Sequence, residues 1–133
     1  MSASNPDHPT FEMTEANFES AINKGGIVLI DFWAAWCGPC RAFAPVYEAA
    51  AKKHPDITFA KVNTEEQQAL AASFDIQAIP TIAIFRDRVL LFAQAGAVSG
   101  AGLEDLITQV QALDMTKVHA EIAEQQKKAP PTA

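Results

Sequence analysis

The sequence predicts a single α/β domain with a mixed β-sheet, and three observations support this. The length of 133 residues is typical of one domain. Apolar runs typical of buried strands alternate with segments of helical periodicity, which favours parallel strands joined by helices. Near the end of the chain, the three residues Arg86 to Arg88 separate two apolar runs, which predicts an antiparallel hairpin.

The first third of the chain predicts a strand, a helix and a second strand. Residues 1–9 are polar and contain two prolines, so we expect a flexible lead. A short edge strand is expected at Thr10 to Met13. Thr14 is a candidate cap for a helix that runs to about Lys24, where two glycines stop it. Ile27 to Phe32 is a continuous, β-branched apolar run, typical of a strand covered on both faces.

The middle of the chain repeats this alternation. After the segment from Trp33 to Cys40, the pattern predicts a helix to about His54, in which Pro45 should cause a kink. Ile57 to Val62 predicts the next strand. Glu65 to Phe74 predicts a helix that Asn63 or Thr64 would cap.

The last part of the chain predicts the hairpin and a final core helix. The hairpin strands are expected at Thr81 to Phe85 and at Val89 to Ala93. Ser99 is expected to cap a helix that runs to about Leu113. Thr116 to Lys128 predicts a weak additional helix, and residues 129–133 are expected to be disordered.

Composition excludes several classes of protein. Apolar residues make up 49% of the chain and charged residues 20%, as in soluble globular proteins. No apolar run reaches the ~18 residues that a membrane span needs. The formal net charge of −6 disfavours binding to nucleic acid. The first twenty residues lack a basic start and an apolar core, which predicts a cytoplasmic protein.

The only two cysteines, Cys37 and Cys40, carry the chemistry. They flank Gly38 and Pro39, follow a predicted strand and open a predicted helix. A free thiol with a pKa of ~8.5 is only about 3% ionised at pH 7, and the N-terminus of a helix raises that fraction. The pattern predicts that Cys37 attacks a disulfide and that Cys40 then resolves the mixed disulfide.

Three other interpretations of the cysteine pair compete with this one. A zinc site needs two more ligands, and none of the three histidines, His8, His54 and His119, has finger-like spacing to the pair. A structural staple over so short a loop stabilises by only roughly 2 kcal/mol. Two inert core thiols fit poorly with a Gly-Pro dipeptide at the start of a helix.

The segment from Asp31 to Arg41, with Trp-Cys-Gly-Pro-Cys at its centre, resembles the active-site signature of the thioredoxin family. The resemblance continues through Ala60–Asn63, Ala78–Thr81 and Gly96. It implies the thioredoxin fold, a central mixed sheet flanked by helices on both faces. The thioredoxin domain would span residues 10–113, and residues 114–133 would form an extension.

An acid and a lysine join the predicted site. Asp31 interrupts an apolar strand, so burial should raise the pKa of its carboxyl group. The resemblance implies that Asp31 accepts the proton of Cys40 and that Lys61 pairs with Asp31 and tunes it.

The resemblance also implies a docking surface. It consists of Trp36, Ile79, Pro80 and Gly96, with a cis bond before Pro80 and an Ile79 backbone free to pair with an extended client segment. Gly38-Pro39 together with Pro80 is expected to tune the redox potential, and the Gly-Pro dipeptide goes with the reducing members of the family.

The predicted function is therefore that of a thioredoxin-type protein-disulfide reductase, an electron carrier in cell redox homeostasis. No metal or organic cofactor is expected, because the electrons reside in the cysteine pair. The expected partners are a thioredoxin reductase, which itself uses NADPH, and disulfide-containing client proteins, and a monomer is the default. The alternatives are a binding or assembly subunit that uses the fold as a clamp, and an oxidase or isomerase.

Overall fold

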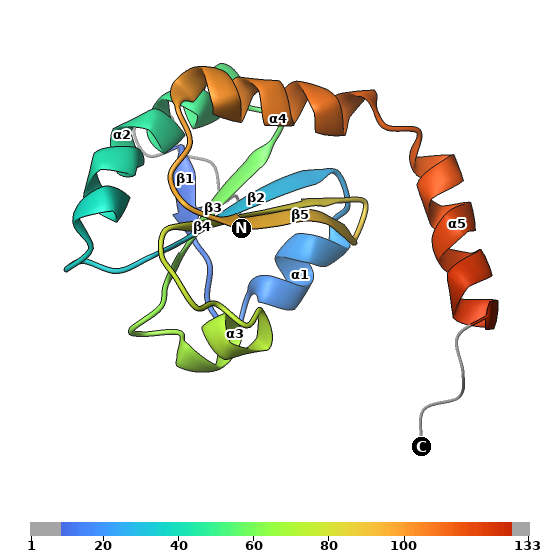
Figure 1. Cartoon of the computed structure of the whole chain (residues 1–133), viewed down its shortest axis with the longest axis horizontal. Coiled ribbons are helices and arrows are strands. Elements are labelled where there is room, and N and C mark those ends of the chain that lie inside the picture. Colours follow the sequence, from blue (N-terminus) through green and yellow to red (C-terminus); the bar gives the residue numbers. More distant parts are fainter. Residues whose placement is uncertain (1–8, 129–133) are drawn as a thin grey trace.

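The computed structural model describes residues 9–128. Five strands form one sheet in the order β1-β3-β2-β4-β5 (Figure 1). β1 and β2 both pair with β3 in parallel, whereas β4 runs antiparallel to β2 and to β5. The predicted mixed sheet is thereby confirmed. The strands are β1 (Thr10–Glu12), β2 (Ile27–Trp33), β3 (Thr58–Asn63), β4 (Thr81–Arg86) and β5 (Val89–Ala95).

Helices cover both faces of this sheet, as predicted (Figure 1). α2 and α4 pack on one face, and α1 and α3 pack on the other. A fifth helix lies beside the sheet near the hairpin. The helices are α1 (Phe18–Asn23), α2 (Gly38–Lys53), α3 (Gln68–Ser73), α4 (Gly100–Ala112) and α5 (Met115–Lys128).

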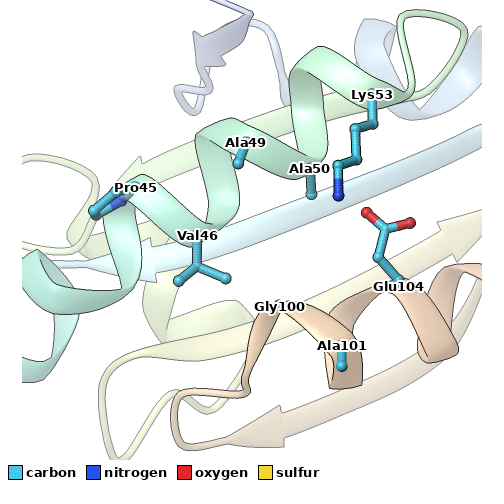
Figure 2. Close-up of a pocket in the computed structure, with 8 residues that line it drawn as sticks. All are labelled: Pro45, Val46, Ala49, Ala50, Lys53, Gly100, Ala101 and Glu104. Atoms are coloured by element: carbon cyan, nitrogen blue, oxygen red, sulfur yellow. The ribbon is translucent and has the colours of Figure 1, made fainter.

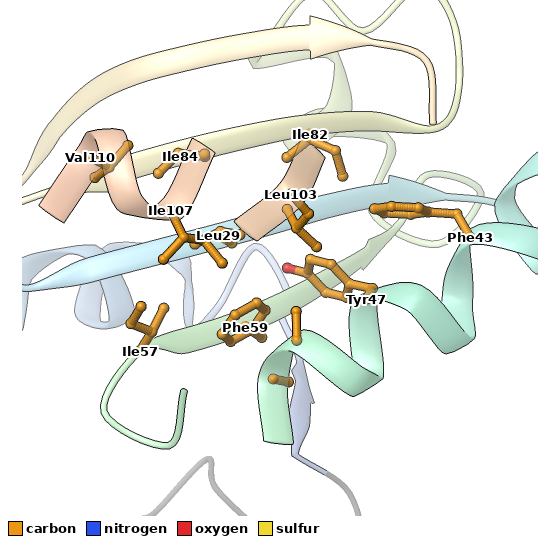
Figure 3. Close-up of a cluster of buried hydrophobic side chains, with 12 residues drawn as sticks. Leu29, Phe43, Tyr47, Ile57, Phe59, Ile82, Ile84, Leu103, Ile107 and Val110 are labelled. Atoms are coloured by element: carbon orange, nitrogen blue, oxygen red, sulfur yellow. The ribbon is translucent and has the colours of Figure 1, made fainter. Parts of the chain in front are cut away.

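The core between the sheet and the helices α2 and α4 fixes the orientation of α2. Figure 3 shows Tyr47 of α2 and Leu103 of α4 facing Leu29 and Phe59 of the sheet. All four side chains are at most 1% exposed. Burial of such side chains contributes roughly 1.5–3 kcal/mol each, so this core holds the N-terminus of α2, which carries the cysteines, against the end of β2.

A shallow groove runs between α2 and α4 on their outer side (Figure 2). Small side chains such as Ala49 and Ala101 line it, and Lys53 faces Glu104 across it. Glu104 Oε1 also lies 2.7 Å from Nε2 of His54, the residue that ends α2. The His54–Glu104 pair ties the C-terminal end of α2 to α4.

α1 and α3 are both shorter than the sequence predicts. The predicted helix start at Thr14 is wrong, because its backbone N–H donates to Oδ1 of Asn17 and the segment closes into a turn before Phe18. The predicted start at Glu65 is wrong for the same reason, since Oδ1 of Asn63 accepts from the N–H of Glu65 in a turn before Gln68. Asn and Thr side chains that bond nearby backbone groups compete with helix formation.

The N-terminus of α3 is capped from a distant part of the chain. Oε2 of Glu15 accepts hydrogen bonds from the N–H groups of Ala69 and Leu70, at 3.0 and 3.3 Å. The Glu15 N–H in turn donates to Oε1 of Gln67 at 3.0 Å. We expect Glu15→Ala to lower the free energy of unfolding by about 1 kcal/mol, as for other helix caps. Urea unfolding measures this, and a change no larger than that of Glu19→Ala on α1 would contradict it.

The hairpin turn consists of Asp87 and Arg88, with φ of 49° and 72°. Positive φ at both positions is the geometry of a type I′ turn, which matches the twist of the flanking strands. Asp87 also holds the end of the α1–β2 loop: its Oδ1 accepts from the N–H of Gly26 and its own N–H donates to the Gly26 carbonyl, both at 2.9 Å.

The segment after α4 remains attached to this hairpin. Nη1 of Arg86 donates to the carbonyls of Val110 and Leu113, at 2.7 and 2.9 Å, where α4 ends. Met115 is buried at the start of α5, and Nε2 of His119 lies 3.3 Å from the Asp87 carbonyl. The predicted disordered end at 129–133, like residues 1–8 of the predicted lead, lies outside the described residues.

Candidate active site

The two cysteines form a disulfide at the N-terminus of α2. Cys37 is the N-cap residue, Cys40 lies in the first turn, and their Cα atoms are 5.2 Å apart. The backbone N–H of Cys40 donates to Sγ of Cys37 at 3.2 Å. In the reduced protein, this N–H and the helix dipole favour negative charge at Cys37, which lowers the pKa of a thiol.

The loop before β4 packs against the cysteines. Sγ of Cys37 lies 3.8 Å from the Ile79 carbonyl, and the Ile79–Pro80 peptide bond is cis, as the resemblance implies. The Pro80 carbonyl accepts the N–H of Gly96 at 2.8 Å. Gly96 has a φ of 107°, which L side chains rarely adopt. Three of the predicted docking residues therefore come together beside Cys37 from the segments before β4 and after β5, with Pro80 buried, Ile79 half-buried and Gly96 exposed.

Trp36 is the fourth predicted docking residue and the most exposed large apolar side chain of the described residues, at 68%. Its Nε1 donates to Oε1 of Glu65 at 2.8 Å. Glu65 is held in turn by Asn63, whose Oδ1 accepts the Glu65 N–H at 2.9 Å. The hydrogen bond to Glu65 orients the exposed indole, which belongs to the residue next to Cys37. The sequence alone does not indicate Glu65, because its role depends on how the β3–α3 turn approaches the active site.

Asp31 lies on β2 beneath α2 and is only 1% exposed. Neither carboxyl oxygen has a hydrogen-bond partner among the described residues. Burial raises the pKa of Asp31 to about 6, and the charge of Lys61 opposes that rise. The Asp31 carboxyl group is therefore mostly ionised at pH 7, and it takes up a proton when the pH falls slightly below 7. The expectation of a buried acid with a raised pKa holds.

Tyr47 of α2 is a second buried titratable group, which the sequence alone does not indicate. Its hydroxyl donates to the Ala60 carbonyl at 2.7 Å. Burial, and secondarily the charge of Asp31, raise the pKa of Tyr47 well above its usual value. In the sequence, Tyr47 is indistinguishable from an ordinary core residue of α2.

Lys61 corrects one expectation. The β2–β3 register places Lys61 directly opposite Asp31, as a pairing lysine requires. No ion pair joins the two, however, in the part of the chain that the structure describes. The Lys61 ammonium instead lies over the Trp33 ring, 4.8 Å from the ring centroid. A cation above an indole face is itself stabilised, so Lys61 acts on Asp31 only through space.

Within 9–128, no three His, Cys, Asp or Glu side chains come together in a group suited to a metal ion. Over the same residues, each helix is too short or too polar to cross a membrane.

Comparison with known proteins identifies the family. The family model for thioredoxin matches residues 9–112. The chain belongs to the thioredoxin family. A relative named putative thioredoxin 2, from Streptomyces coelicolor, is 51% identical over 120 residues, which cover 90% of each chain.

Solved structures agree with this assignment. A mutant thioredoxin from Halobacterium salinarum matches with a TM-score of 0.74 and 32% identity, over 86% of this chain and 99% of the other. A chain from the structure of a complex of ferredoxin:thioredoxin reductase and thioredoxin f2 matches with a TM-score of 0.70 and 27% identity, over 76% of this chain and 94% of that chain. The fold is the thioredoxin fold, and the protein is a thiol–disulfide oxidoreductase of the protein-disulfide reductase type. Thioredoxins act through the cysteine pair itself, without an organic cofactor.

Proposed function

We propose that this thioredoxin reduces disulfides of client proteins with Cys37 as the nucleophile and Cys40 as the resolving thiol. The observation that supports these roles best is the hydrogen bond from the Cys40 N–H to Sγ of Cys37 at the start of α2. It favours charge on Cys37 rather than on Cys40, and the attacking group in disulfide exchange is a thiolate.

The reaction then has two exchange steps. The Cys37 thiolate attacks one sulfur of the client disulfide, a Cys37–client bond forms, and the other client sulfur leaves as a thiolate. Cys40 next loses its proton and attacks Sγ of Cys37, which breaks the mixed disulfide and releases the second client thiolate. Two electrons pass to the client, and the protein is left with the Cys37–Cys40 disulfide that the structure contains.

Asp31 is the proposed acceptor of the Cys40 proton. A pKa of about 6 leaves the carboxylate ionised at neutral pH. This pKa also lies close to the operating pH, which suits a general base. Lys61 tunes this base through its charge. The redox potential is proposed to depend on Gly38 and Pro39, which lie between the two cysteines at the start of α2, and on Pro80.

The client is proposed to dock at the site formed by Trp36, Ile79, Pro80 and Gly96, in which Pro80 is buried. Trp36 supplies an exposed apolar rim. An extended client segment would pair with the Ile79 backbone by strand addition, which brings its disulfide to Cys37.

The cellular setting of the reaction is also a proposal. A thioredoxin reductase, drawing on NADPH that it binds itself, would return the Cys37–Cys40 disulfide to the dithiol. A solved relative in a complex with ferredoxin:thioredoxin reductase supports a reductase partner in general. The formal net charge of −6 supports protein clients over nucleic acid. We place the protein in the cytoplasm as a monomer that carries electrons for redox homeostasis.

A redox titration of the Cys37–Cys40 pair against a thiol buffer tests this function. Trp36 adjoins Cys37 and Trp33 packs near the pair, so tryptophan fluorescence reports the redox state. We expect a two-electron transition with a midpoint potential well below about −200 mV, which is the redox potential of an oxidising compartment. A higher potential would instead indicate an oxidase or isomerase, and no titration at all would indicate a clamp that does not use its cysteines.

A further inference from the structure

Three charged residues lie in one row across the sheet beneath the active site. The strand registers pair Glu12 of β1 with Lys61 of β3, and Lys61 with Asp31 of β2. Residues opposite each other in register point to the same face, and neighbouring strands are about 4.8 Å apart. From the centre of the sheet to its edge, the row therefore consists of the buried Asp31, then Lys61, then the exposed Glu12.

A pocket of about 430 Å³ opens at the edge end of this row. Lys61 and Trp33 line it from the sheet interior, and Glu12 and Glu66 line it from the rim. Asp31 is not among its lining residues. Lys61 consequently stands between the buried acid and the open pocket. The remaining lining residues are Thr10, Phe11 and Asn63.

The Lys61 ammonium lies over the Trp33 ring and, in residues 9–128, pairs with neither carboxylate of the row. A lysine ammonium sits on a flexible four-carbon stem, so its mean position responds to the charges on both sides. Moving it toward the pocket weakens its attraction to Asp31, because Coulomb energy falls with distance.

We propose that Glu12 is a positioning residue for the second exchange step: its carboxylate draws the Lys61 ammonium toward the edge pocket and so limits how strongly Lys61 stabilises the ionised form of Asp31. This inference rests on the proposed role of Asp31 as the base for Cys40. The competing explanation is that Glu12 is an edge-strand charge that only discourages strand pairing between molecules. In that case it has no influence on Asp31.

The test is a titration of the Asp31 carboxyl group by carbon NMR in the oxidised full chain. In this state the two cysteines do not titrate, so the titratable groups around Asp31 are Lys61 on β3 and Tyr47 on α2, with Glu12 and Glu66 beyond Lys61. We expect Glu12→Gln to lower the pKa of Asp31 by about half a unit or more. The matched control, Glu19→Gln on α1, lies on the other face of the sheet and should leave it unchanged.

A second background separates the route through Lys61 from direct repulsion. In Lys61→Met, or in Lys61→Gln if the first variant does not fold, Glu12→Gln should shift the pKa of Asp31 by less than half as much. No shift in the native background, or an equal shift in both backgrounds, overturns the proposal.

The kinetics provide an independent readout. The acid limb of the pH–rate profile for client reduction should move to lower pH in Glu12→Gln, together with the pKa of Asp31. If Asp31→Asn leaves that limb in place, the proposed role of Asp31 as base fails. The NMR titration still decides whether Glu12 acts on Asp31 through Lys61.

Discussion

Cys37→Ser should abolish client reduction, with a fall in rate of about 10³-fold or more, the scale seen when an enzyme loses its nucleophile. A serine hydroxyl at this position stays protonated at neutral pH, even beside the N–H of Cys40, and so cannot attack a disulfide. Reduction of a fluorescent peptide disulfide under steady supply of a chemical reductant measures the loss.

Cys40→Ser separates the two roles and serves as the matched variant. It keeps the Cys37 thiolate and removes the resolving thiol, so a mixed disulfide with the client should accumulate and be visible on non-reducing gels. The double variant, Cys37→Ser with Cys40→Ser, should trap nothing. If Cys37→Ser traps clients instead, the nucleophile has been assigned to the wrong cysteine. If the double variant retains the cellular role, the clamp alternative holds.

The strands were predicted well because their sequences depend little on context. Ile27–Trp33 is buried along almost its whole length, and a continuous apolar run indicates such a strand directly. The short helices were predicted less well. Around Thr14 and Asn63, side chains accept hydrogen bonds from nearby backbone N–H groups, and apolar spacing alone does not reveal these turns.

The sequence likewise predicts one part of the active site and leaves another part open. A strand followed by a helix placed Cys37 at a helix N-terminus, and the apolar neighbours of Asp31 indicated its burial. The partners that these groups meet depend on tertiary geometry. The sequence does not show that Glu65 bonds Trp36, or that the Lys61 ammonium prefers the Trp33 ring to the buried acid.

Asp31→Asn should make the protein more stable at neutral and alkaline pH. Asp31 is 1% exposed and has no hydrogen-bond partner in the described part of the chain, and its pKa in the folded state is about 6. In the unfolded chain its pKa is close to 3.8. Ionised Asp31 therefore opposes folding by about 3 kcal/mol above pH 7. The asparagine amide is also buried without partners, so we expect a gain of about 2 kcal/mol.

The pH dependence is the decisive part of this prediction. Between about pH 6 and pH 4 the folded state takes up a proton at Asp31 that the unfolded state does not, so the native protein gains stability as pH falls and the advantage of Asp31→Asn shrinks. Urea unfolding at pH 8 and at pH 4 measures both limits, and an equal advantage at the two values would contradict the origin in charge burial. The same variant should slow the second exchange step, because it removes the proposed base. The unpaired carboxylate would then be a case in which catalysis is retained at the expense of stability.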